Sequence, residues 1–87
     1  MGKYDPLARY LKKLPDTVEE TELSFSDIER IIGDSLPESA WEHNAWWANE
    51  QCGSHVQARA WVEVGWDVID KNQDRKHGWV RFARRLP

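Results

Sequence analysis

WDVIDKNQDRKHGWVRFARR, residues 66–85, decides the fold that the sequence predicts. Apolar and polar side chains alternate in residues 66–70 and again in residues 79–85, which is typical of β-strands. Residues 71–78 between them are polar and end in Gly78. The stretch therefore predicts a C-terminal β-hairpin whose loop is longer than a tight turn.

The alternation in the last strand also predicts which side chains face outward. If Val80 and Phe82 point into the core, Trp79 and Arg81 lie on the opposite face. There the Trp79 indole could stack on a base, grip a protein partner or pack beneath the Arg81 guanidinium.

The first helix is predicted from residue 6 onward. Asp5 and Pro6 suit its N-cap and its first helical position. Apolar side chains then follow at helical spacing: Leu7, Tyr10, Leu11 and Leu14. Pro15 ends the helix, and the acidic residues 16–22 are expected to form a solvated loop.

Residues 23–33, LSFSDIERIIG, predict a short strand that leads into a second helix. Ser26 and Glu29 have the spacing of a capping box, and Gly33 is a natural stop. The buried stripe of this helix is expected to be Ile28, Ile31 and Ile32. Because so short a strand needs a partner, we expect it to pair with the hairpin.

Two further capping-box spacings precede the hairpin. Ser35 and Glu38 predict a short helix, and Ser54 with Gln57 predicts another over residues 54–64. The inward face of the latter helix is predicted to hold Val56, Ala60, Trp61 and Val64. Its outward face is predicted to hold Ser54, His55, Ala58, Arg59 and Val62.

This order of elements predicts an α+β fold that resembles a winged helix: helix, short strand, helix, helix and C-terminal β-hairpin. The 87 residues are expected to form a single small domain, residues 1–87, whose core six tryptophans help to fill. The one cysteine excludes an internal disulfide, and the sequence shows no membrane span or signal peptide. We therefore expect a cytoplasmic protein.

The first function that the sequence suggests is duplex DNA binding. In a winged helix, the helix at residues 54–64 would enter the major groove, where Arg59 could pair with guanine. The basic loop at residues 71–77 would touch the phosphate backbone. The predicted nucleic-acid contacts are Ser54, His55, Ala58, Arg59, Lys71, Arg75, Lys76 and Arg81.

The alternative is a protein-interaction module, which includes self-association and the role of a phage or bacterial adaptor. Trp79 and the Trp46–Trp47 corner would supply aromatic contacts, which are common at interaction hot spots. Residues 1–50 hold 5 Lys and Arg against 11 Asp and Glu, so this acidic half could steer a basic partner. A weaker hypothesis is a pocket for a flipped base formed by Trp46, Trp47 and Asn49.

Metal and enzyme chemistry are predicted to be absent. His43, Cys52 and His55 lie close in sequence, but a structural zinc site needs four ligands, and a fourth is distant. Cys52 with His55 lacks the third group that orients a catalytic pair. We therefore expect a non-enzymatic protein without a cofactor or metal.

The motifs YDPLARYL, LSFSDIERIIGDSLPESA, AWWAN, HVQARAW, GWDV and VRFARR follow one another in order. In this the chain resembles, from Tyr4 to Arg85, a family of small uncharacterised bacterial domains of unknown function. The resemblance implies a bacterial or phage cytoplasmic protein and no particular activity. It also implies that one cluster unites Trp46, Trp47, Asn49, His55, Gln57 and Trp61.

Overall fold

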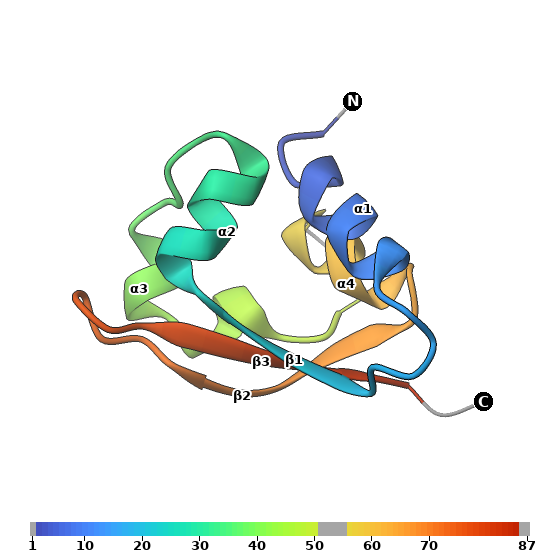
Figure 1. Cartoon of the computed structure of the whole chain (residues 1–87). Coiled ribbons are helices and arrows are strands. Elements are labelled where there is room, and N and C mark those ends of the chain that lie inside the picture. Colours follow the sequence, from blue (N-terminus) through green and yellow to red (C-terminus); the bar gives the residue numbers. More distant parts are fainter. Residues whose placement is uncertain (1, 51–55, 86–87) are drawn as a thin grey trace.

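Helices cover one face of a three-stranded antiparallel sheet (Figure 1), so the predicted α+β class is confirmed. The computed structural model describes residues 2–50 and 56–85. In chain order its elements are α1 (Asp5–Lys13), β1 (Glu20–Ser24), α2 (Phe25–Ile32), α3 (Ser39–Glu42), the 3-10 helices η1 (Asn44–Trp47) and η2 (Val56–Ala58), α4 (Arg59–Val62), β2 (Trp66–Asn72) and β3 (Trp79–Arg84).

The predicted hairpin and its pairing with the early strand are confirmed. The strand order is β1-β3-β2, so β3 lies between β1 and the other hairpin strand. Val80 and Phe82 are fully buried, and Trp79 is half-buried on the opposite face. The Arg81 guanidinium lies 5.1 Å from the centre of the Trp79 ring, so Trp79 packs beneath Arg81, one of the contacts that the sequence suggested for this indole.

The strand β1 begins earlier than the sequence predicted. Residues 20–22 were expected in a solvated loop, but they pair with residues 81–83 of β3. Acidic side chains are compatible with an edge strand because they point to solvent, as those of Glu20 and Glu22 do.

The capping box of α2 is formed by Ser24 and Asp27, so the prediction of Ser26 and Glu29 was wrong. The Asp27 N–H donates to Ser24 Oγ at 2.9 Å, and the Ser24 N–H donates to Asp27 Oδ2 at 3.1 Å. The helix starts at Phe25, whose N–H still donates to the carbonyl of Gly78, the residue before β3, at 3.0 Å. The predicted stop at Gly33 is confirmed, with φ +71°.

Two other predicted caps are wrong. Asp5 is the first residue of α1, after Tyr4, and its carboxylate accepts from the Gly2 N–H. Ser35 does not cap a helix with Glu38, because α3 begins only at Ser39 and has no side-chain cap.

Indoles fill the space between the helices and the sheet. Trp47, Trp61 and Trp66 are at most 2% exposed. The Trp47 and Trp61 rings stack with 5.7 Å between their centres. Trp61 was predicted to face inward, and this is confirmed. The other three tryptophans, Trp41, Trp46 and Trp79, are half-buried.

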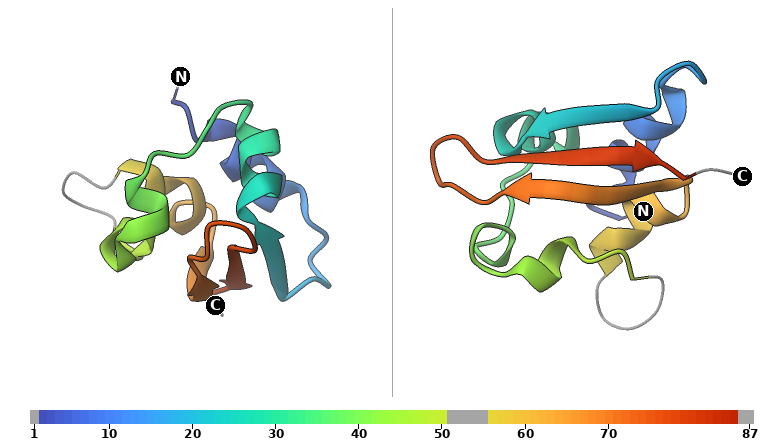
Figure 2. Two further views of the ribbon diagram at one scale, coloured as in Figure 1. Left: turned by 90° about the vertical axis from the view of Figure 1, so that its left-hand side faces the viewer. Right: turned by 90° about the horizontal axis from the view of Figure 1, so that it is seen from below.

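The opposite face of the sheet is open. Seen from below, the three strands lie in front of the helices, and no helix of the described residues covers them (Figure 2). Cross-strand partners share a face, so this outer sheet face consists of Trp79, Arg81 and Ala83 of β3 with their partners Glu20, Glu22, Ser24, Asp67, Asp70 and Asn72.

Candidate functional site

The helix predicted for residues 54–64 ends earlier than expected. Its described part is the 3-10 helix η2 followed by α4, which ends at Val62. Ala58, predicted to face outward, is fully buried, and Val62 is 3% exposed. Val56, predicted to face inward, is 59% exposed. The prediction is confirmed for Ala60 and Trp61, which are buried, and for Arg59, which is exposed. It is wrong for Val56 and Ala58 because a 3-10 turn advances about 120° per residue rather than about 100°.

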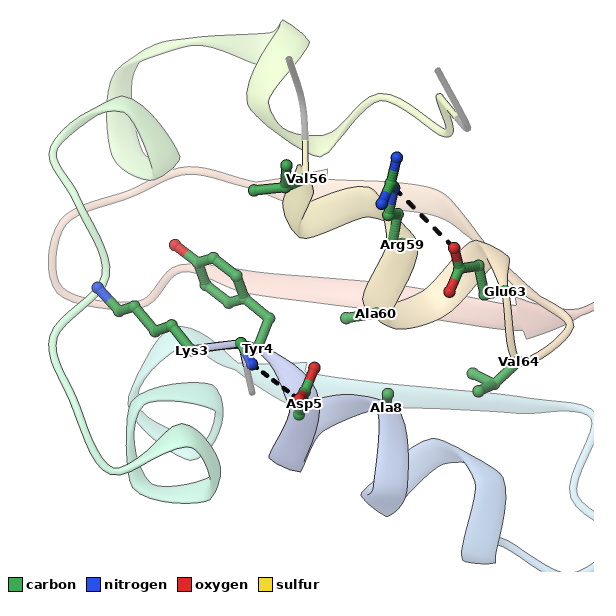
Figure 3. A pocket seen from close by; sticks show the side chains of 10 residues that line it. Lys3, Tyr4, Asp5, Ala8, Val56, Arg59, Ala60, Glu63 and Val64 are labelled. Atoms are coloured by element: carbon green, nitrogen blue, oxygen red, sulfur yellow. Dashed lines mark hydrogen bonds and ion pairs between the residues drawn. The ribbon is translucent and has the colours of Figure 1, made fainter. Parts of the chain in front are cut away.

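What remains exposed on this segment faces α1 across a pocket of about 390 Å³ (Figure 3). Arg59 pairs with Glu63 across 3.9 Å, and Asp5 and Lys3 add one charge of each sign on the α1 side. The segment therefore forms a charge-balanced hollow with α1. Ser54 and His55, the other predicted groove contacts, lie outside the described residues.

The basic loop of the hairpin is partly neutralised. The Arg75 guanidinium lies 3.2 Å from a carboxylate oxygen of Glu38 and 3.2 Å from one of Glu42. It also covers the Trp41 ring at 5.5 Å. Lys76 is exposed, and Lys71 belongs to β2, where it is half-buried.

Arg81 is the centre of an ion-pair ladder across all three strands. Its guanidinium lies 2.9 Å from Glu22 of β1 and 3.9 Å from Asp70 of β2. The hydrogen bond to Glu22, aided by nearby carboxylates, raises the pKa of Arg81 above its ordinary value. This cation, predicted to contact nucleic acid, already has two anionic partners.

The predicted aromatic cluster exists, and most of it is structural. The Trp47 Nε1–H donates to the Ala40 carbonyl at 2.8 Å, and the Trp61 Nε1–H donates to Asn49 Oδ1 at 2.9 Å. Gln57 is buried and donates to the Trp46 carbonyl at 2.8 Å. These polar groups serve the core, which leaves Trp47 and Asn49 unsuited to hold a flipped base.

Trp79 lies apart from that cluster, beside a pocket at the hairpin end of the outer sheet face. This Trp79 pocket has a volume of about 390 Å³. Its aromatic walls are Phe25, Trp41 and Trp79. The other lining residues are Glu22, Ser24, Ser26, Asp27, Arg75, Lys76, His77 and Gly78.

Sequence reasoning missed Glu22 and Trp41 as members of this site. Glu22 alternates with Leu23 in ETELS, and this period of two was a usable signal once the strand was extended to residue 20. Trp41 reaches the pocket through α3, which meets the hairpin loop by way of Arg75. No local pattern predicted that contact.

The outer sheet face is acidic. It carries four carboxylates, those of Glu20, Glu22, Asp67 and Asp70, with the Arg81 guanidinium among them. Arg85, just beyond β3, pairs with Asp67 at 2.8 Å. Because Arg81 and Arg85 pair with three of these four carboxylates, two positive charges against four negative ones leave the face a net charge of −2. This remaining negative charge repels phosphate and attracts cationic groups.

In residues 2–50 and 56–85, no group of three His, Cys, Asp or Glu side chains is placed to hold a metal ion. Cys52 and His55 lie outside these ranges. Within the same part of the chain, no helix is long and apolar enough to cross a membrane.

The fold and the site define a small α+β protein with an indole core and one open, acidic sheet face. The chain belongs to the family described as Domain of unknown function (DUF7662), whose model matches residues 4–83. No curated protein and no solved structure matches this chain.

Proposed function

We propose that this protein is a non-enzymatic protein-binding domain that receives a basic segment of a partner on its outer sheet face, with Trp79 as the main contact. The observation that carries the proposal is the position of Trp79 on an uncovered face that holds four carboxylates. Tryptophan is enriched among residues that dominate binding energy, and complementary charge increases the rate of encounter.

The ion-pair ladder supports this role because it orders the surface before binding. Arg81 lies over Trp79 at 5.1 Å and is held in turn by Glu22 at 2.9 Å. A side chain that is already ordered loses less conformational entropy when a partner binds. A cytoplasmic location, which a chain with a single cysteine suits, belongs to the same proposal.

Duplex DNA binding through a winged-helix arrangement is the rival proposal, and the geometry favours it less. Arg59, Arg75 and Arg81 were its principal cations, and each has a carboxylate within 4 Å. Ala58, which was to lie against the groove, is buried. Lys76 and Lys71 alone would supply few phosphate contacts.

The test is selection of a random peptide library displayed on phage against the immobilised protein. We expect the selected peptides to be rich in lysine and arginine and to lose at least about tenfold in affinity with Trp79→Ala. Trp46→Ala is the matched control, since Trp46 is also half-buried but packs against Tyr4 and Trp47, outside the site.

Peptides that bind Trp79→Ala and the wild-type protein equally would contradict the proposal. Fluorescence anisotropy with a labelled random duplex, at low and at raised salt, tests the rival directly. Duplex binding that falls steeply with salt and is weakened by Lys76→Ala would favour the DNA-binding function instead.

A further inference from the structure

The two edge strands of the sheet, β1 and β2, differ in how far their outward backbone groups are occupied. At the β2 edge, the Asn49 side chain occupies both backbone groups of Val68, and the register shifts between Val68 and Asp70. An occupied, bulged edge resists pairing with another strand. The β1 edge has neither feature.

The hydrogen bonds at the two ends of the β1–β3 ladder show which β1 groups are free. The Arg84 N–H donates to the Glu19 carbonyl at 2.7 Å, and the Phe25 N–H donates to the Gly78 carbonyl at 3.0 Å. The backbone N–H and carbonyl groups of the odd-numbered β1 residues therefore point toward β3, because hydrogen-bonded and non-hydrogen-bonded pairs alternate along an antiparallel ladder. These are the backbone groups of Thr21 and Leu23.

The backbone groups of Glu20 and Glu22 point away from the sheet. Neither residue has a backbone hydrogen bond to any other element among the described residues. The Ser24 N–H is already taken by the Asp27 carboxylate at 3.1 Å. The Ser24 carbonyl is also taken, because the carbonyl of an N-cap residue accepts the first hydrogen bond of its helix. The edge thus offers two N–H groups and two carbonyls, those of Glu20 and Glu22.

The negative charges of Glu20 and Glu22 beside this edge favour a basic strand as the binding partner. Glu20 and Glu22 place their carboxylates on the outer sheet face, directly beside the position of an added strand. In a second copy of β1 paired antiparallel about Thr21 or Glu22, glutamates would lie opposite one another, and like charges directly opposite are destabilising. A strand with lysine or arginine at alternate positions would be attracted instead.

The Trp79 pocket lies at the end of the same edge. Glu22 and Ser24 line the pocket and also belong to the edge, so a strand on β1 would continue into the pocket at its Ser24 end. Main-chain hydrogen bonds would then supply affinity, and alternate side chains would supply specificity.

From this geometry, and resting on the proposed function, we infer that the partner binds as a fourth strand on the open edge of β1. Its alternate basic side chains meet Glu20 and Glu22, and one terminal side chain enters the Trp79 pocket. The ligand class is therefore an extended basic peptide segment.

Amide hydrogen exchange measured by NMR tests the inference with a defined probe. The probe is an eight-residue peptide of alternating lysine and threonine, capped at both ends. On saturation we expect exchange of the Glu20 and Glu22 amides to slow at least about tenfold, because they gain hydrogen bonds. The Thr21 and Leu23 amides, already bonded to β3, should change little.

Two control peptides separate strand addition from simple charge attraction. A peptide of alternating glutamate and threonine should not bind. One with all its lysines before all its threonines has the same charge as the probe and should bind at least about threefold more weakly. Failure of the probe to bind, or equal protection of odd and even β1 amides, would overturn the inference.

Glu20→Pro removes one outward N–H without touching the β3 ladder, and proline is tolerated on edge strands. We expect this variant to bind the probe at least about tenfold more weakly than the wild-type protein. Glu20→Ala, which keeps the N–H and removes only the charge, should lose about twofold to threefold. Equal losses in the two variants would refute main-chain pairing, and the exchange experiment stands if Glu20→Pro does not fold.

The failures of the two proposals can be told apart. If phage-selected peptides depend on Trp79 but leave the Glu20 and Glu22 amides unprotected, the binding function stands and strand addition is wrong. If the amides are protected while Trp79→Ala has no effect on binding, strand addition stands and the role of Trp79 is wrong.

Discussion

The side-chain amide of Asn49 pairs with both backbone groups of Val68, in the way that a residue of a neighbouring strand would. Nδ2 donates to the Val68 carbonyl at 2.9 Å, and Oδ1 accepts from the Val68 N–H at 2.8 Å. The same Oδ1 accepts from the indole N–H of Trp61 at 2.9 Å. One side chain therefore closes the β2 edge and joins it to the core.

Asn49→Ala removes these three hydrogen bonds and leaves the Trp61 N–H without its acceptor. We expect the free energy of unfolding to fall by about 2–3 kcal/mol. Urea denaturation measures the change. Asn44→Ala is the control, because Asn44 is also exposed and should change stability by less than about 0.5 kcal/mol. Equal effects of the two substitutions would show that the Asn49 bridge does not stabilise the fold.

The two serines at the start of α2 are expected to differ in their effect on stability. Ser24→Ala loses the hydroxyl that accepts from the Asp27 N–H at 2.9 Å, which should cost about 1 kcal/mol. Ser26 is exposed and lies within the first turn, so Ser26→Ala should cost less than about 0.5 kcal/mol. Thermal unfolding of both variants checks the order, and the reverse order would place the cap at Ser26.

Acid is expected to weaken this cap. Hydrogen bonds from Ser24, first from its backbone N–H, lower the pKa of Asp27 below its ordinary value of 3.8. A carboxyl whose pKa is lower in the folded state contributes stability that is present above pH 3.8 and is lost as the pH falls through the folded-state pKa. Asp27→Asn should therefore be less stable than the wild-type protein at pH 7, and the difference should shrink below pH 3.8. Urea midpoints at pH 7 and pH 3 test this, and a constant difference would contradict it.

Two buried indoles should respond differently to replacement by phenylalanine. The Trp61 N–H is bonded to Asn49, whereas Trp66 Nε1 is the one buried side-chain nitrogen or oxygen among the described residues with no hydrogen-bond partner. Both substitutions leave a similar cavity, but only Trp61→Phe removes a hydrogen bond. We expect Trp61→Phe to cost about 1 kcal/mol more than Trp66→Phe in urea unfolding. Equal costs would mean that the Trp61–Asn49 bond adds no net stability.

The residues that local pattern placed correctly share one property. Val80, Phe82, Trp79 and Arg81 were assigned to their faces by an alternation of two, which depends only on the backbone of one strand. The stop at Gly33 was equally local, because a left-handed residue suits glycine.

The residues that pattern placed wrongly depend on distant partners. Ser24 rather than Ser26 caps α2 because Phe25 stays bonded to Gly78 of the hairpin. Ala58 is buried because η2 is a 3-10 turn, which moves it onto the core side. Neither spacing nor propensity contains that information.

The sequence by itself thus determined the α+β class, the hairpin and the outward position of Trp79, since these follow from short-range periodicity. It also predicted the pairing of the early strand, because so short a strand needs a partner. Only the tertiary structure decided how charge is distributed over the surface. From the sequence alone, Arg75 and Arg81 were expected to be free to contact a partner. Folding places Glu38 and Glu42 beside Arg75, and Glu22 beside Arg81, although these residues are far apart in the sequence. The same folding leaves the acidic outer sheet face open, because the helices lie on the other face of the sheet (Figures 1 and 2).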